Sequence, residues 1–194
     1  MIVRRQKPRV YNDYKSYKRY LRIDFDSRCA YCGITEYRWG SDRNFVVEHF
    51  RPRRWFKHLE TAYANLYWAC NRCNDIKSDT WPTPEEEQLG YGWVDPCSPD
   101  VKGGHWIELS DGNLDPRTRQ GEYTVEGLWL NLRSYLVRWR KERRDLLDDI
   151  DATLKTVERL HRAALSSMAR SDADDLIRLL DLHRRLCERL RLEY

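Results

Sequence analysis

No stretch of about 18 consecutive apolar residues occurs in the sequence, and a helix needs roughly that length to cross a bilayer. The N-terminal segment, MIVRRQKPRVYNDYKSYKRY, is basic but lacks the apolar core of a secretory signal. Internal repeats and low-complexity tracts are also absent from the sequence. These absences, together with 34% charged residues, argue against a membrane protein or a secreted one. We therefore expect a cytoplasmic protein.

The 194 residues are enough for one hydrophobic core, or for one core with an appendage. The net charge of +4 is small but unevenly distributed. Residues 1–80 hold 17 Lys and Arg against 9 Asp and Glu, whereas residues 81–194 hold 18 against 22. Fifteen of the 24 aromatic residues also lie in residues 1–80. This basic, aromatic-rich half favours contact with a polyanion.

Four of the six cysteines form two pairs of identical spacing, Cys29-x-x-Cys32 and Cys70-x-x-Cys73. Disulfides are rare in the cytosol, where such pairs more often bind metal or carry out redox chemistry. Two Cys-x-x-Cys turns supply the four thiolates of a tetrahedral zinc site. A redox site needs one pair, normally within a βαβ pattern that this sequence lacks. The pairs therefore predict structural zinc rather than a dithiol redox site or unrelated free thiols.

The neighbours of the pairs refine this prediction. Arg28 and Arg72 lie next to the pairs and would favour the ionised thiolates that zinc needs. Cys97 and Cys187 have no partner motif, and we expect them to be packing residues. The two pairs are separated by 37 residues, more than the roughly 15–20 of a zinc ribbon. The insertion must therefore have a function of its own.

Hydrophobic periodicity predicts the elements around the cysteines. Residues 12–25 have the apolar spacing of a short amphipathic helix, and the β-rich composition of residues 44–50 predicts a strand ended by Pro52. Residues 53–64 are expected to be a loop or short helix. NLYWAC at 65–70 then leads into a short helix over the second cysteine pair.

The rest of the chain is expected to contain a linker and a helical hairpin. Residues 81–125 are rich in Pro and Gly and include two strand-like pieces, HWIEL and GEYTV, on either side of the turn SDGN. From about residue 126 an apolar three–four rhythm that begins at Leu132 predicts a long helix. Ser171, followed by Asp172, has the pattern of the N-cap of a second helix, which would pack antiparallel to the first after a turn near 168–171. The expected divisions are 1–80, 81–125 and 126–194.

The insertion and the residues after it carry a carboxylate, an imidazole and two amides. These side chains belong to Glu48, His49, Asn65 and Asn74. The zinc ion would hold them in one neighbourhood, and the set suits phosphodiester hydrolysis. Histidine deprotonates water near neutral pH, and Mg²⁺ prefers carboxylate and amide oxygens.

Three segments in combination resemble the zinc-bearing form of the HNH endonuclease family. They are CAYCG at 29–33, VEHFRP at 47–52 and NLYWACNRCNDIK at 65–77. The resemblance covers about residues 25–80 and implies an α+β chain with a ββα-metal core, in which a hairpin and a helix hold a catalytic ion. It also implies DNA as the substrate and Mg²⁺ or Mn²⁺ as the catalytic ion, in addition to structural zinc.

The resemblance also implies roles for individual residues. His49 would be the general base, and Glu48 a ligand of the catalytic metal. Asn65 would fix the loop and orient His49, and Asn74 would help to bind the metal. Glu48 replaces the commoner Asp and Asn74 the commoner His, which leaves the identity of the metal open. The side chains expected to contact phosphates are Lys77, Arg51 and Arg53.

The segments after residue 80 are similar to the tail of HNH subunits in Septu-type and retron-linked anti-phage systems, where the nuclease acts with an ATPase. The segments are WVDPCSPD, SDGNL and GEYTVEGLWLNLRSYLVRWRKER. The similarity implies an ATPase partner, with the helical hairpin as its docking surface. Association with a second copy of the chain stays open.

Two other readings compete with the nuclease. A non-catalytic zinc module would bind nucleic acid through the basic half, and an assembly protein would act mainly through the helical hairpin. The pair Glu48-His49 favours the nuclease, because a binding module has no need of an acid–base pair beside the zinc frame.

Overall fold

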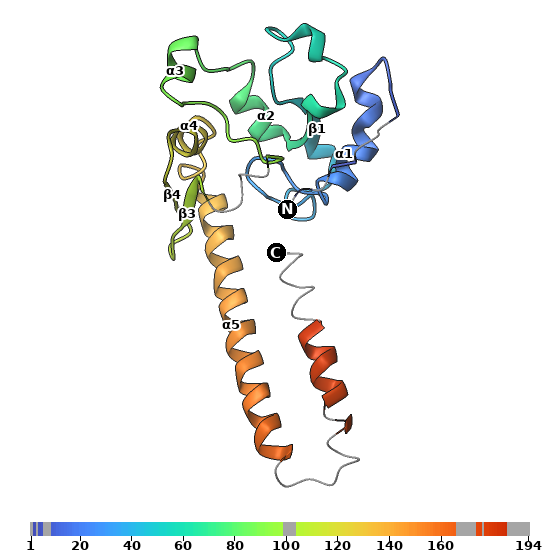
Figure 1. The fold of residues 1–194 in the computed structure, drawn as a ribbon, viewed down its shortest axis with the longest axis vertical. Helices are drawn as coiled ribbons and strands as arrows, with labels where there is room; N and C mark the ends of the chain where they lie inside the picture. Colours follow the sequence, from blue (N-terminus) through green and yellow to red (C-terminus); the bar gives the residue numbers. More distant parts are fainter. Residues whose placement is uncertain are drawn as a thin grey trace. The chain divides into compact units, whose positions relative to one another are not determined.

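The computed structural model of the chain divides into two compact units. Unit 1 comprises Met1–Leu109 and Asn113–Val137, and unit 2 comprises Ser110–Gly112 and Arg138–Tyr194 (Figure 1). The residues that the structure describes are 2, 4, 5, 9–98, 104–165, 174, 175 and 177–185. Within these ranges, every helix is too short or too polar to cross a membrane.

The N-terminal helix forms as its apolar spacing predicts. A 3-10 turn, η1 (Tyr14–Tyr17), continues into helix α1 (Lys18–Asp24), and the Asp13 side chain caps the turn by accepting from a backbone amide. Tyr17 and Leu21 are buried, because residues four apart lie on the same face of a helix. This face packs against the strands described next.

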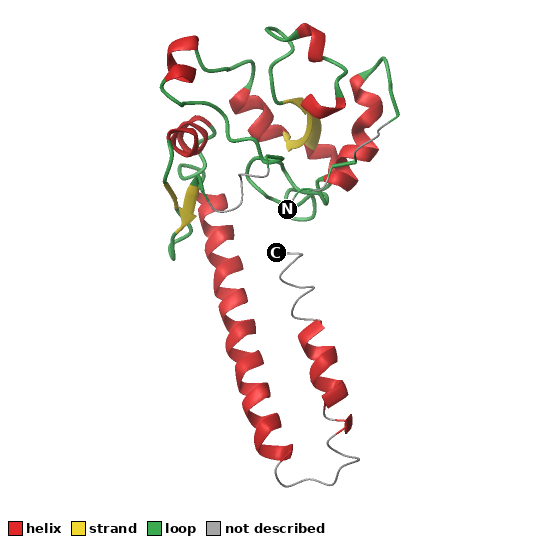
Figure 2. Ribbon diagram, viewed as in Figure 1, coloured by secondary structure: helices red, strands yellow, loops and turns green. Residues whose placement is uncertain are grey.

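The centre of unit 1 is a two-stranded antiparallel sheet followed by a helix. Strand β1 (Phe45–His49) pairs with strand β2 (Leu66–Cys70), and helix α2 (Asn71–Lys77) begins directly after β2 (Figure 2). The register places His49 opposite Leu66. Three 3-10 turns surround the strands: η2 (Asp42–Asn44), η3 (Lys57–Leu59) and η4 (Tyr63–Asn65). All five residues of β2 are buried, so this strand is the core of the unit.

The remainder of unit 1 contains short elements, and one prediction there is wrong. Strand β3 (Trp106–Glu108) pairs with strand β4 (Leu114–Pro116) around the predicted SDGN turn. The segment GEYTV was expected to be the second strand, but it lies in helix α4 (Arg119–Gly127). The reason is the cap: Thr118 accepts a hydrogen bond from Gly121 N at 3.0 Å and starts the helix.

The first turn of this helix requires a glycine at position 121. A Cβ atom on Gly121 would lie 2.0 Å from the His105 carbonyl oxygen, so only glycine allows this approach.

Helix α3 (Pro84–Gln88) begins with a capping box between Thr83 and Glu86. Helices and small antiparallel sheets thus share unit 1, in agreement with the α+β class.

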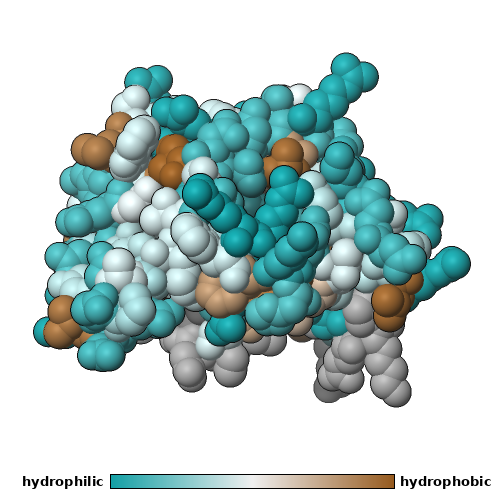
Figure 3. All heavy atoms as spheres, turned by 90° about the horizontal axis from the view of Figure 1, so that it is seen from above, coloured by the Kyte–Doolittle hydropathy of each residue, from teal (hydrophilic) through white to brown (hydrophobic). Residues whose placement is uncertain are grey.

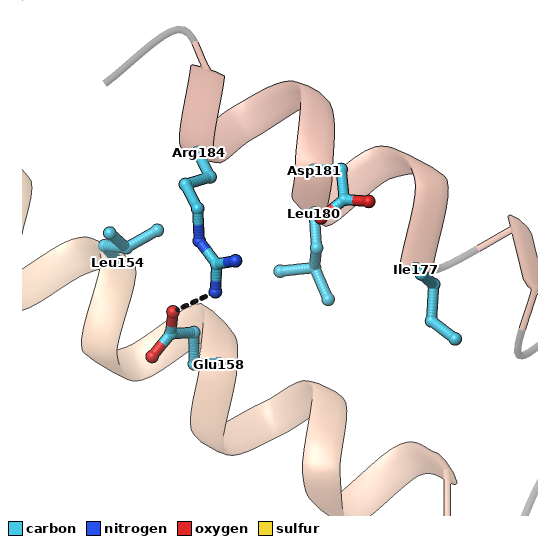
Figure 4. Close-up of a pocket in the computed structure, with 6 residues that line it drawn as sticks. All are labelled: Leu154, Glu158, Ile177, Leu180, Asp181 and Arg184. Carbon is cyan, nitrogen blue, oxygen red and sulfur yellow. Dashed lines mark hydrogen bonds and ion pairs between the residues drawn. The ribbon is translucent and has the colours of Figure 1, made fainter. Parts of the chain in front are cut away.

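Helix α5 (Ser134–Leu165) is the longest element and extends from unit 1 into unit 2. It starts later than the sequence pattern suggested, since Leu132 precedes it and is 81% exposed. Unit 2 also contains the helical residues 177–185, and Arg184 forms an ion pair with Glu158 of α5 beside a small pocket (Figure 4).

Part of the predicted hairpin is not covered by these elements. The turn near 168–171, the expected cap Ser171 with Asp172, and Cys187 lie outside the described residues. The antiparallel hairpin therefore stays a prediction.

Candidate active site and metal centre

The two cysteine pairs lie close together in space, one in a tight turn and the other at the junction of β2 and α2. Cys29 and Cys32 flank a tight turn, in which Gly33 N donates to Cys29 O at 2.9 Å and Gly33 adopts a φ of 73°. Ala30 N donates to Trp68 O, which fixes this turn against β2. Cys70 ends β2 and caps α2, since its sulfur accepts from the amide of Cys73 at 3.4 Å.

The four cysteine sulfurs have the spacing of a tetrahedral zinc site. All four lie within 4.8 Å of one another, and Cys32 Sγ is 3.9 Å from Cys70 Sγ. Zn–S bonds of about 2.3 Å in a tetrahedron require a sulfur–sulfur distance of about 3.8 Å. Among the described residues, this is the one group of three or more His, Cys, Asp or Glu side chains close enough to share an ion. The cluster therefore fits zinc.

Electrostatics in the cluster favours the thiolate at Cys29, whereas burial and the neighbouring sulfurs raise the pKa of Cys32 and of Cys73 well above its ordinary value. Burial alone would raise the pKa of the Cys29 thiol, but hydrogen bonds from the other three cysteines lower it well below its ordinary value. Zinc binds the thiolate form, so a preformed anionic sulfur assists binding.

The cationic contact to the cluster comes from a residue that the sequence did not indicate. Arg28 forms an ion pair with Asp26, and Arg72 lies over the ring of Trp129. Arg133, which is 60 positions beyond Cys73 in the chain, places both terminal nitrogens 3.4 Å from the Cys73 sulfur. Burial would lower the pKa of Arg133, but the sulfurs of Cys73 and Cys32 raise it above its ordinary value, so it stays cationic.

Glu48 lies in a buried polar network on the α2 side of β1. Its carboxylate is 3% exposed and accepts hydrogen bonds from Tyr31 Oη at 2.5 Å and from Lys77 Nζ at 2.7 Å. Burial and the neighbouring Glu48 raise the pKa of Tyr31 well above its ordinary value, so Tyr31 remains a donor. Tyr31 lies inside the first Cys-x-x-Cys turn, and the sequence did not indicate its contact with Glu48.

Lys77 is fully buried, in contrast to the exposed lysine expected for a phosphate contact. Its ammonium is 0% exposed and also donates to the carbonyl oxygen of His49 at 3.0 Å. Lys77 thus joins the end of α2 to the end of β1. In this arrangement its immediate anionic partner is Glu48.

His49 is half-buried, and its neighbours define its tautomer. Successive residues of a strand point to opposite sides, so His49 and Glu48 have different surroundings. His49 Nε2 lies 2.9 Å from the carbonyl oxygen of Glu60, and the ring packs edge-on against Tyr14. Because a carbonyl oxygen only accepts, Nε2 carries the hydrogen and a neutral His49 has its lone pair on Nδ1.

Asn65 fixes the loop that carries this carbonyl group. Its Oδ1 accepts from Arg51 N at 2.8 Å, and its Nδ2 donates to Arg51 O at 3.0 Å and to Leu59 O at 3.4 Å. Phe50 N also donates to Asn65 O at 2.9 Å, which extends the β1–β2 pairing by one residue. The buried amide therefore holds both ends of the loop that lies between His49 and Glu60.

The groups available to a divalent ion are an acidic and an amide side chain. Each oxygen of Glu48 has one hydrogen bond, which leaves each with a second lone pair. Asn74 uses its amide nitrogen in a bond to Asp75, and it lies three residues before Lys77 on the same side of α2. Carboxylate and amide oxygens are the ligand types that Mg²⁺ prefers, so Glu48 and Asn74 are the candidates to hold such an ion.

The arginines of the loop are exposed and lie among aromatic rings. Arg51 lies over Phe56 and Trp81, and Arg53 lies over Tyr14 while its guanidinium is 3.7 Å from Glu60. The face of the molecule in Figure 3 is mainly hydrophilic, with its hydrophobic residues in small separate groups. Because the side chains of Arg51 and Arg53 are exposed, both are accessible to a charged ligand.

Comparison with known proteins agrees with this geometry. Residues 29–80 match the family described as HNH endonuclease, a segment that contains both cysteine pairs, Glu48 and His49. The match supports a nuclease of the HNH type with a zinc-binding cysteine cluster. No curated protein and no solved structure matches the chain. The family match ends at residue 80, so the similarity of the later segments to Septu-type subunits stays a prediction.

Proposed function

We propose that this protein is a DNA endonuclease that hydrolyses phosphodiester bonds with His49 as the general base. The observation that carries the proposal is the hydrogen bond from His49 Nε2 to the Glu60 carbonyl, which leaves Nδ1 as the basic atom. The HNH match over residues 29–80 supports the same reaction class.

In the proposed reaction, Nδ1 of His49 accepts a proton from water as the water oxygen bonds to phosphorus. The bond from phosphorus to the leaving oxygen breaks, and that oxygen takes a proton from solvent. The Glu60 carbonyl stabilises the imidazolium through Nε2–H, and Asn65 holds the loop that carries Glu60. Asn65 is thus a positioning residue.

Glu48 and Asn74 would hold a Mg²⁺ or Mn²⁺ ion in the active enzyme. Such an ion, when bound, neutralises negative charge on the phosphate. Tyr31 and Lys77 orient the Glu48 carboxylate through their hydrogen bonds to its two oxygens. We assign Lys77 this positioning role in place of a phosphate contact, because its ammonium is buried.

Arg51 and Arg53 are proposed to contact the DNA backbone. Both are exposed on the loop that Asn65 fixes, close in sequence to His49. Neutralising a phosphate with arginine releases counterions, so binding should weaken steeply with salt.

The proposal extends to the biological role of the nuclease. We propose an anti-phage effector nuclease that acts in the cytoplasm, where reduced thiols can bind zinc, and that depends on an ATPase partner. Unit 2 would offer the docking surface for the ATPase or for a second copy of the chain. The basis is the similarity of the segments after residue 80 to the tails of HNH subunits in such systems.

A plasmid-nicking assay with Mg²⁺ or Mn²⁺ tests the reaction, with and without a candidate ATPase. His49→Ala should lose at least about 100-fold in rate, as expected for removal of a general base. His58→Ala is the matched control, because His58 is an exposed histidine of the same loop and should leave the rate unchanged. Equal cleavage by His49→Ala would remove His49 from the mechanism. Tight DNA binding without any cleavage by the wild type would instead favour the non-catalytic zinc module.

A further inference from the structure

Arg133 is a buried cation at the metal centre that neither the family resemblance nor the sequence pattern indicates. It is 6% exposed, lies directly before α5, and directs both terminal nitrogens at Cys73 Sγ. We propose that Arg133 is an outer-sphere partner of the zinc cluster, so that zinc binding and the packing of residues 128–137 stabilise each other. This inference does not depend on the nuclease reaction.

The negative charge of the zinc-bound cysteine cluster explains why a buried arginine lies beside it. A zinc ion with four thiolates carries a net charge of −2, and all four cysteines are buried. A buried charge is costly unless it is paired and hydrogen-bonded. A sulfur bound to zinc retains lone pairs, so the guanidinium can donate to Cys73 while Cys73 binds the ion. The two parallel N–H groups of arginine suit this contact better than a lysine ammonium.

The backbone around Arg133 links this contact to the start of α5. Leu136 N donates to Arg133 O at 2.8 Å in the first turn of the helix. Tyr135 stacks on Trp39 with ring centroids 4.9 Å apart. Burial raises the pKa of Tyr135 to about 12. Leu128, Leu130 and Leu136, on either side of Arg133 in the sequence, are also buried. If zinc strengthens this packing, the packing must strengthen zinc binding by the same factor.

The experiment compares two arginines of the full-length, zinc-loaded protein. Arg133→Met and Arg72→Met each remove one positive charge near Cys73, but only Arg133 donates to its sulfur. Zinc affinity is measured by competition with a chromophoric chelator. Loss of an outer-sphere partner should weaken zinc binding about 10- to 100-fold in Arg133→Met. Arg72→Met should match the wild type.

A spectroscopic readout separates a bond to sulfur from general destabilisation. In protein loaded with Co²⁺, the sulfur-to-metal charge-transfer band reports the electron density on the thiolates. Removal of the hydrogen bonds to Cys73 should move this band to longer wavelength in Arg133→Met and leave it in place in Arg72→Met. Hydrogen exchange of residues 128–137 should also accelerate in zinc-loaded Arg133→Met.

The outcomes that would overturn the inference are equally specific. They are a wild type without zinc, or an Arg133→Met protein with wild-type zinc affinity and an unshifted cobalt band. If Arg133→Met does not fold, Arg133→Lys decides the question by the same two measurements. The lysine variant should bind zinc less tightly than the wild type, with a band shifted in the same direction. Wild-type values in Arg133→Lys would count against the proposal.

Discussion

Two lysines form ion pairs of nearly equal length in the two units, but in different surroundings. Lys77 of unit 1 is 2.7 Å from Glu48 with both side chains almost fully buried, whereas Lys141 of unit 2 is 2.8 Å from Asp145 with both more than half exposed. In the buried pair, loss of one partner leaves an unpaired charge away from water. In the exposed pair, water replaces the partner. Two ion pairs of nearly equal length therefore contribute differently to the stability of the fold.

Most charged groups of the two units show the same contrast, with the exception of Arg140 in unit 2, which is buried and donates to Gly112 O at 2.6 Å. Around the candidate site, Glu48, Lys77 and Arg133 each have a fixed polar partner and little contact with solvent. The charged residues of α5 beyond Val137 lie mostly at the surface. We infer that the buried polar groups of unit 1 fix the geometry of the candidate site. The exposed charges of unit 2 mainly keep the long helix α5 soluble.

The largest effect should come from breaking the buried pair. Lys77→Met should lower the free energy of unfolding by about 3–5 kcal/mol, because it leaves the Glu48 carboxylate buried without a counter-charge. Adding Glu48→Gln should recover part of this loss, since the remaining amide is neutral. The measurement is a double-mutant cycle by urea unfolding, followed through tryptophan fluorescence.

The exposed pair provides the control for this cycle. Lys141→Met removes the same charge from an ion pair of the same length, and its unfolding midpoint should equal that of the wild type. If Lys77→Met and Lys141→Met had equal midpoints, burial would not be what distinguishes the two pairs.

A smaller effect is expected at Asp24, which has a partly exposed partner. Asp24 accepts hydrogen bonds from Arg5 Nη2 at 2.6 Å and from Tyr63 Oη at 2.7 Å. Burial would raise the pKa of Asp24, but the bonds from Arg5 and Tyr63 lower it below its ordinary value. Asp24→Asn should therefore lower the free energy of unfolding at pH 7 by about 2 kcal/mol, as for hydrogen bonds to a charged group.

The pH dependence of this variant has a definite sign. A carboxyl group with a lowered pKa in the folded state stabilises the protein above its unfolded pKa, about 3.9 for Asp, and loses this contribution as the pH falls. The difference between wild type and Asp24→Asn should thus be constant near neutrality and shrink below about pH 4. Thermal unfolding at a series of pH values measures it. A difference that grew on acidification would contradict the assigned direction.

Much of the candidate site was predictable because its signals are local. The Cys-x-x-Cys spacing indicated the metal cluster, and the β-rich composition of residues 44–50 indicated β1. The proposed role of Asn65 in the loop followed from the family resemblance, and the hydrogen bonds of its amide are consistent with that role. Each of these depends on a spacing of a few residues or on a short motif.

The features that escaped prediction depend on long-range contacts or on a single cap. Arg133 lies 60 residues from Cys73, and in the sequence it resembles any surface arginine of a charged helix. The segment GEYTV has the composition of a strand, yet the cap at Thr118 makes it helical. Lys77 has the position of a phosphate-binding residue, and only the fold shows that its ammonium meets Glu48.

The smallest expected effect concerns the surface pair of unit 2, Arg184 Nη2 and Glu158 Oε1 at 2.7 Å (Figure 4). Reversing one charge, in Glu158→Arg or Arg184→Glu, should lower the thermal midpoint of the helical signal slightly, because like charges then face each other. The double variant should restore the midpoint, and added salt should suppress the whole cycle, since exposed charges are screened within about 10 Å at 0.1 M. Circular dichroism at low and high salt measures both effects. An interaction that persisted at high salt would mean that the pair is desolvated like Glu48 and Lys77, and the contrast between the two units would then fail at this position.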